Sequence, residues 1–106
     1  MKIVALMYLE EDEASVAKLL KEHGVVGYSR LPLEGHGEGA RGWLGTVHTF
    51  SSFMSFAILP DEKAHELMDA VQECTNCKHP KHPIHALQVD VERTVESSVS
   101  DAGFPA

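Results

Sequence analysis

The sequence has 106 residues, of which 43% are hydrophobic, so it can form one domain with a single core but not two. Its formal net charge is −7 and its nine Lys and Arg residues are dispersed, which excludes general nucleic-acid binding. It contains no run of about eighteen apolar residues for a membrane-spanning helix, and its first residues lack the pattern of a signal peptide. We therefore expect a cytoplasmic protein without direct membrane insertion.

The first third of the chain predicts a strand, a helix and a second strand. Residues 2–8 form a short apolar run bounded by charge, as in a buried strand. A helix is expected over residues 10–23, ended by Gly24, because glycine favours the backbone conformation that closes helices. Its apolar residues recur at helical spacing: Val16, Leu19 and Leu20. Residues 25–33 predict a strand that Pro32 restricts to a sheet edge or an exit.

A glycine-rich loop and a third strand follow. The stretch 34–45 contains five glycines, so a mobile loop is expected over residues 34–46. Residues 47–59 predict a strand in which three large apolar residues alternate with small ones: Met54, Phe56 and Ile58. Phe53 is out of phase with these three, so both faces of this strand should meet apolar groups. We expect Phe53 and Ala57 on the face that the helices leave uncovered.

The last third predicts a helix, a strand and a tail. Asp61 is the expected N-cap of the helix. The core positions of this helix are Ala64, Leu67, Met68 and Val71. Alternation of apolar and polar residues over 87–92 predicts a half-exposed final strand, and residues 95–106 lack periodicity, as in a flexible C-terminal tail.

The order β-α-β-β-α-β predicts an α+β fold of the ferredoxin-like class. Such a fold has a four-stranded antiparallel sheet with two helices on one face. We expect this domain over residues 1–94, followed by the tail. The apolar residues on the uncovered face predict a homo-oligomer, because a chain this short cannot cover them itself.

Both cysteines lie in one stretch, CTNCKHPKHPIH, which begins at Cys74. Thiolates at this spacing can ligate a soft transition metal, and His79, His82 or His85 could complete the site, although two prolines limit convergence. A redox pair is a second interpretation, but the cysteines follow a helix rather than open one, which disfavours thiol catalysis. A third is a loop that is inert or merely borders a ligand. In the cytoplasm we expect both thiols to be reduced.

No set of nucleophile, base and orienting residue is recognisable. Ser51, Ser52 and Ser55 occupy a predicted strand without a histidine or acid at catalytic spacing. The sequence therefore argues against an enzyme.

The order of elements, with a glycine-rich loop between strands two and three, resembles the PII-like family of signalling proteins. The similar segments are MKIVALM, GVVGYSRLPLEGHGEGARG, ILPDEKAHELMDAVQE and the terminal VERT. The resemblance covers about residues 1–94, and its more specific parts are GxGxxxRG in the loop and the Pro-Asp-Glu junction before the second helix. It looks closest to the divergent branch tied to carbon or metal transport.

The resemblance implies a homotrimer that binds an adenine nucleotide (ADP, AMP or ATP) between subunits. It implies that Gly35 and Gly37 approach the phosphates and that Arg93 reaches them from the next subunit. We also count His36, Arg41, Gly42 and Lys78 among the candidate residues of this nucleotide or anion site, because they lie in or near the two loops and Arg41 and Lys78 carry positive charge. Lys78 lies where relatives carry a glycine-rich second ligand loop, a slot that here contains no glycine.

Two functional hypotheses remain. The first is a non-enzymatic sensor that binds an adenine nucleotide, with a small anion such as bicarbonate, and regulates a membrane transporter or an enzyme through the mobile loop. The second is a cytoplasmic metal-binding or metal-sensing protein. Its candidate ligands are Cys74, Cys77, His79 and His82.

Overall fold

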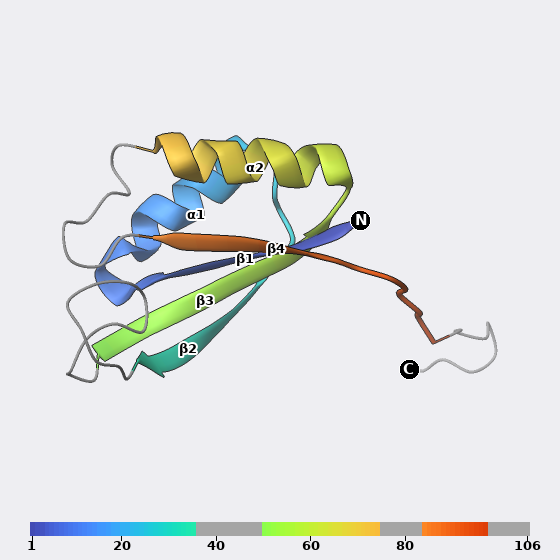
Figure 1. The fold of residues 1–106 in the computed structure, drawn as a ribbon. Coiled ribbons are helices and arrows are strands. Elements are labelled where there is room, and N and C mark those ends of the chain that lie inside the picture. The colour runs from blue at the N-terminus through green and yellow to red at the C-terminus, as the bar shows by residue number, and fades with distance from the viewer. Residues whose placement is uncertain (36–49, 75–83, 98–106) are drawn as a thin grey trace.

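A computed structural model describes residues 1–35, 50–74 and 84–97 of the chain (Figure 1). Its elements are β1 (Lys2–Leu9), the 3-10 turn η1 (Glu10–Asp12), α1 (Glu13–Glu22), β2 (Ser29–Gly35), β3 (Phe50–Leu59), α2 (Asp61–Glu73) and β4 (His85–Asp90). This order confirms the predicted β-α-β-β-α-β arrangement. Within the described ranges, none of the helices has the length and apolar character that crossing a membrane requires.

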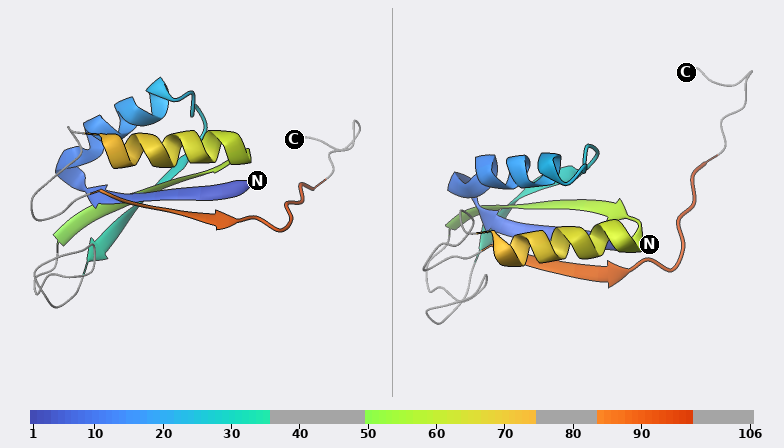
Figure 2. Two further views of the ribbon diagram at one scale, coloured as in Figure 1. Left: turned by 45° about the horizontal axis from the view of Figure 1, so that its top comes forward. Right: turned by 90° about the horizontal axis from the view of Figure 1, so that it is seen from above.

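The four strands form one antiparallel sheet in the order β2-β3-β1-β4. Both helices lie on the same face of this sheet, as the views in Figures 1 and 2 agree. The predicted ferredoxin-like class is therefore confirmed. Pro32 lies inside β2, at the edge of the sheet, where a residue without an N–H group is tolerated.

The hydrophobic core fills the space between the sheet and the two helices. Its most buried members come from β1, α1 and α2, and include Leu6, Val16 and Leu67. The predicted apolar positions of α2 are confirmed, because Ala64 and Leu67 are buried while Met68 and Val71 pack against the core. Helical spacing on an amphipathic segment is the signal that made these positions predictable.

The end of α1 is closed by a complete Schellman motif. The N–H of Gly24 donates to the carbonyl of Lys21 at 3.1 Å, and the N–H of Val25 donates to the carbonyl of Leu20 at 2.9 Å. Gly24 has a φ of 74°, the left-handed conformation that this motif requires. Val25 and Leu20 also meet in the core, so the chain leaves the helix in a fixed direction.

This motif corrects the predicted start of the second strand. Strand character was expected from Val25, but β2 begins at Ser29, because the Val25 N–H is used by the helix cap. The strand also continues two residues further than expected, to Gly35, which pairs with Phe50 of β3.

The predicted N-cap of α2 was off by one residue. Pro60 occupies the cap position, and Asp61 is the first residue of the helix. The Asp61 carboxylate accepts a hydrogen bond from the N-terminal amine of Met1, and this bond lowers the pKa of Asp61 below its ordinary value of 3.8. A carboxylate in the first turn also interacts favourably with the helix dipole.

The two faces of β3 are the reverse of the prediction. Phe53 and Ala57 face the helices, where Ala57 is buried in the core and Phe53 packs against it. The uncovered face carries the alternating set instead: Met54, Phe56 and Ile58. Register determines the outcome, because Ala57 pairs with the buried Val4 of β1. Both faces of the strand carry apolar residues, but the expectation that the outer face meets apolar groups stays a prediction.

Replacing Gly24 by alanine should lower the free energy of unfolding by about 1–2 kcal/mol, because a Cβ is unfavourable in the left-handed conformation. That Cβ would also lie 2.8 Å from the Lys63 Nζ, which donates to the His23 carbonyl. Gly27→Ala is the matched control, since a Cβ there meets nothing within 4 Å. Urea denaturation of both variants checks this; equal stabilities would contradict it.

The burial of His85 should make the stability depend on pH at values above those at which carboxylates titrate. Burial lowers its pKa below the ordinary value of 6.5, so the unfolded chain binds a proton more readily than the folded one. The unfolding free energy should therefore fall as the pH drops below 6.5, and His85→Gln should flatten this slope. Urea titrations of the wild type and of His85→Gln from pH 8 to pH 5 measure both slopes. An unchanged slope in His85→Gln would contradict the assignment.

Candidate functional site

The ends of several elements meet at one end of the sheet. Gly35, the last residue of β2, pairs with Phe50, the first residue of β3. At the same end, His85 of β4 pairs with Met7 near the end of β1, and α2 ends nearby (Figure 1). Both exits therefore lie at the same end of the sheet, the one towards 36–49 at the β2 edge and the one towards 75–83 on the side of β4.

Most of the predicted ligand residues fall in those two stretches and lie outside the described residues. They are His36, Gly37, Arg41, Gly42, Cys77, Lys78, His79 and His82. The structure places four of the predicted residues: Gly35, Cys74, His85 and Arg93.

Arg93 lies at the opposite end of the molecule from Gly35. The last residue of β4, Asp90, pairs with Lys2 at the beginning of β1, and Arg93 follows three residues later, exposed. β1 has eight residues, so the two ends of the sheet are about 26 Å apart at ~3.3 Å per residue. Figure 1 shows the chain after β4 running away from the sheet. One copy of the chain therefore cannot bring Gly35 and Arg93 to the same ligand.

This placement also corrects the sequence interpretation of Arg93. It was expected on the terminal strand, but β4 ends at Asp90. The N–H of Val91 still donates to the carbonyl of Met1 at 3.1 Å. Residues 92–97 are exposed and have no regular secondary structure.

Cys74 lies at the junction between α2 and the second of those stretches. It is the C-cap residue of α2, its N–H donates to the carbonyl of Val71 at 3.3 Å, and its side chain packs against the core. The structure holds Cys74 in a disulfide, in contrast to the reduced thiol expected from the sequence. A cysteine in a disulfide has no thiolate with which to ligate a metal.

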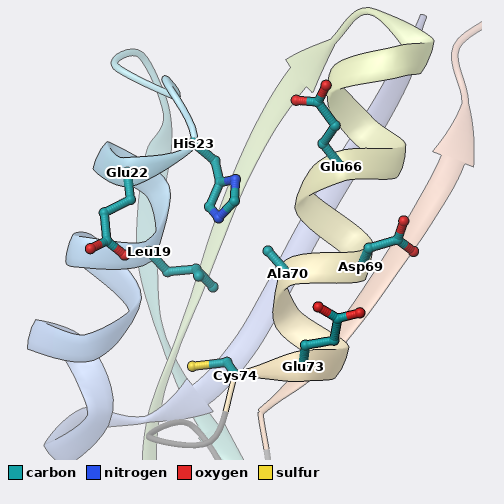
Figure 3. Close-up of a pocket in the computed structure, with 8 residues that line it drawn as sticks. All are labelled: Leu19, Glu22, His23, Glu66, Asp69, Ala70, Glu73 and Cys74. Atoms are coloured by element: carbon teal, nitrogen blue, oxygen red, sulfur yellow. The ribbon is translucent and has the colours of Figure 1, made fainter.

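An acidic groove between α1 and α2 was missed by the sequence reasoning. It has a volume of about 690 Å³ and a small apolar floor of Leu19 and Ala70 (Figure 3). Its other lining residues are Glu22, His23, Glu66, Asp69, Glu73 and Cys74. Acids spaced three and four apart along one side of α2 were the available signal. Carboxylates repel phosphate, so this groove does not suit a nucleotide.

The described residues show no metal centre. Over 1–35, 50–74 and 84–97, no group of three or more His, Cys, Asp or Glu side chains is arranged to hold a metal ion. The acids of the groove are included in this finding.

A polar and aromatic cluster fixes β2 against the rest of the fold. The Arg30 guanidinium lies 4.8 Å from the centroid of the Phe53 ring and forms an ion pair with Glu13 of α1. Beneath it, the hydroxyl groups of Tyr8 and Ser55 are 2.6 Å apart in a buried hydrogen bond. Burial raises the pKa of Tyr8 above its ordinary value of 10.0. Because these groups bind one another, the cluster has a structural role rather than a ligand-binding one.

The face of the sheet opposite the helices is an apolar surface that residues 1–35, 50–74 and 84–97 leave uncovered. The register aligns three cross-strand rows on it: Ile58–Ile3–Val89, Phe56–Ala5–Leu87 and Met54–Met7–His85. Ile58 is 50% exposed, Val89 51% and Leu87 38%. Contiguous apolar area of this kind is typical of a protein–protein interface.

Comparisons with known proteins identify the fold. The sequence matches no protein-family model and no curated protein. Among solved structures, a protein of Thermus thermophilus described as PII-like and signalling is similar, with a TM-score of 0.61 and 24% identity over 85% of each chain.

CPII, a nitrogen regulatory PII-like protein of Thiomonas intermedia, is also similar in structure. Its TM-score is 0.59 at 19% identity, over 89% of this chain and 94% of CPII. The CPII structure contains ADP, AMP and bicarbonate. The element order, the antiparallel sheet and the one-sided helices are common features of such folds. The chain therefore has the fold of the PII-like signalling proteins.

Proposed function

We propose that the chain is a non-enzymatic, trimeric sensor that binds an adenine nucleotide, together with a small anion such as bicarbonate, in clefts between subunits. The fold shared with CPII, whose structure contains these ligands, supports this proposal. Two polar groups of the core, the hydroxyls of Tyr8 and Ser55, are hydrogen-bonded to each other.

The observation that carries the proposal is the separation of Gly35 from Arg93. Phosphate binding needs close backbone N–H groups and a cation, and the chain places these two candidates at opposite ends of β1. Two copies arranged head to tail would bring the Arg93 of one copy to the Gly35 of the next. A cyclic trimer produces three such sites from three identical contacts.

The uncovered sheet face supplies the surface for this assembly. Its rows of apolar side chains run across β3, β1 and β4, so one continuous area is available for contact. Burying such area removes apolar surface from water and stabilises the trimer.

The regulated partner is a membrane transporter or an enzyme, which would dock where residues 36–49 leave the sheet. Gly35 and Phe50 hold the two ends of this stretch side by side. A nucleotide bound at Gly35 would therefore act directly on the beginning of the 36–49 stretch. Ordering a segment through a ligand is a common way to convert ligand binding into a partner signal.

The alternative of a metal sensor has no support in the described part of the chain. Its first ligand, Cys74, is disulfide-bonded, so it cannot coordinate a metal as the structure stands. We therefore retain the nucleotide sensor alone.

Calorimetry with ATP, ADP and AMP, each with and without bicarbonate, tests ligand binding. At least one nucleotide should bind, and Arg93→Gln should weaken it about tenfold or more, the usual effect of losing a hydrogen bond to a charged group. Lys21→Gln removes the same charge from α1 and should leave the affinity unchanged. No heat with any ligand would refute the proposed function, and equal losses in both variants would refute the role of Arg93.

Light scattering tests the assembly. The wild-type protein should be a trimer, and Val89→Glu should dissociate it, because a charge on the uncovered face cannot be buried without a partner. Val26→Glu is the matched control, since Val26 is 92% exposed in the connection after α1. A monomeric wild type, or a trimer that survives Val89→Glu, would contradict the proposed interface.

A further inference from the structure

The strand pattern of β4 continues past the point where the sheet stops pairing with it. Apolar and polar residues alternate along most of β4, and beyond its end Val91 and Val95 continue the apolar positions with Arg93 between them. The Val91 N–H still donates to the Met1 carbonyl, but residues 92–97 are exposed and have no regular secondary structure. This segment therefore has a strand-like pattern without a partner among the described strands of its own copy.

The opposite edge of the sheet is formed by β2. In the order β2-β3-β1-β4, only β3 of the described strands pairs with β2, so its outer side presents backbone N–H and C=O groups to a further strand. β2 and the prolonged β4 are thus the two edges of one sheet. Joining the β4 edge of one copy to the β2 edge of the next uses two different surfaces, and three such contacts can close a ring.

We propose that residues 93–97 of one copy pair with β2 of the next copy as an added antiparallel strand. In this register Arg93 lies opposite Gly35, Val95 opposite Leu33, and the last residue of the segment opposite Leu31. The pairing depends on the proposed function, which brings Arg93 of one copy to Gly35 of the next, and it supplies the segment and the register that hold them together. Addition of a strand to an exposed sheet edge is a recurrent mode of recognition.

The side-chain faces agree with this register. Residues directly opposite each other in two strands share a face, and every second residue of a strand returns to it. Leu31 pairs with Met54 of the uncovered face, so Leu33 lies on that face too. Val89 lies on the uncovered face of β4, and Val95 returns to it six residues later. The pairing therefore brings Val95, which is 74% exposed in one copy, against the half-buried Leu33.

Charge and length favour the antiparallel direction. With Arg93 held at Gly35, a parallel strand would place Glu92 opposite Glu34, and like charges directly opposite each other are unfavourable. A parallel strand would also carry Val95 past the end of β2, because Gly35 is its last residue. The antiparallel strand runs back along β2 instead and places a neutral residue opposite Glu34.

Pro32 limits which strands this edge can accept. It lies exposed in the middle of β2 and has no N–H group, so its pair with Glu96 forms at most one backbone hydrogen bond. A proline on an edge disfavours pairing with arbitrary strands. Side-chain pairs such as Val95 with Leu33 then decide which segment is bound.

The added strand and the uncovered sheet face fit one assembly. Three sheets joined edge to edge around an axis turn one face towards that axis. Both helices lie on the other face, so the apolar rows are the face that can pack at the centre (Figure 2). The edge contact and the face contact therefore belong to the same ring.

Disulfide cross-linking tests the register. Directly opposite residues of an antiparallel pair have Cα atoms about 4.5–5.5 Å apart, a separation that a disulfide can span. After mild oxidation, Leu33→Cys/Val95→Cys should form at least about tenfold more covalent trimer on a non-reducing denaturing gel than either single variant. Leu33→Cys/Thr94→Cys is the matched control and should match the single variants, because Thr94 would lie on the opposite face.

A wild type that is trimeric by light scattering, with no more covalent trimer from Leu33→Cys/Val95→Cys than from the control, would overturn the added strand and leave the proposed function intact. A monomeric wild type would remove both. Hydrogen exchange provides a readout that needs no substitution. In the wild-type trimer, alternate amides of residues 93–97 should exchange at least about tenfold more slowly than in an unstructured peptide of the same sequence, and equal rates would also overturn the added strand.

Discussion

The architecture depends on the burial of β1 on both faces. This strand pairs with β3 on one side and β4 on the other, and Val4 to Tyr8 are all buried. On the side of the helices, the residues of β1 form part of the hydrophobic core. On the opposite side, its residues form the middle of the three apolar rows. A strand that is apolar on both faces needs cover on both, and the two helices provide it on only one. In the proposed trimer, the alternate residues of the same strand, Ile3, Ala5 and Met7, would lie at the centre of the contact.

Much of the fold could be predicted because its signals are local. The apolar residues of α2 recur with helical spacing, and Gly24 marks the end of α1 because the backbone conformation there favours glycine. The faces of β3 could not be predicted in the same way. Met54, Phe56 and Ile58 are larger than Ala57, so size alone pointed them inward. Ala57 faces the helices instead, because it pairs with Val4, which lies 53 positions away in the sequence.

The candidate site was less predictable than the fold, since it depends on distances between residues far apart in the sequence. The resemblance paired Gly35 with Arg93, but only the antiparallel register shows that they lie at opposite ends of one chain. The groove between α1 and α2 is also a tertiary feature, because Glu22 and Glu73 come from different helices. No local pattern in the sequence specifies that Cys74 is held in a disulfide.

A site divided between two copies makes ligand binding and assembly thermodynamically linked. If the nucleotide contacts Gly35 of one copy and Arg93 of another, each bound molecule contributes its free energy to holding the copies together. Apparent affinity then depends on protein concentration, and dilution weakens binding without altering any contact within a subunit. Abundance of the protein would itself become an input to the signal, alongside the concentration of the nucleotide.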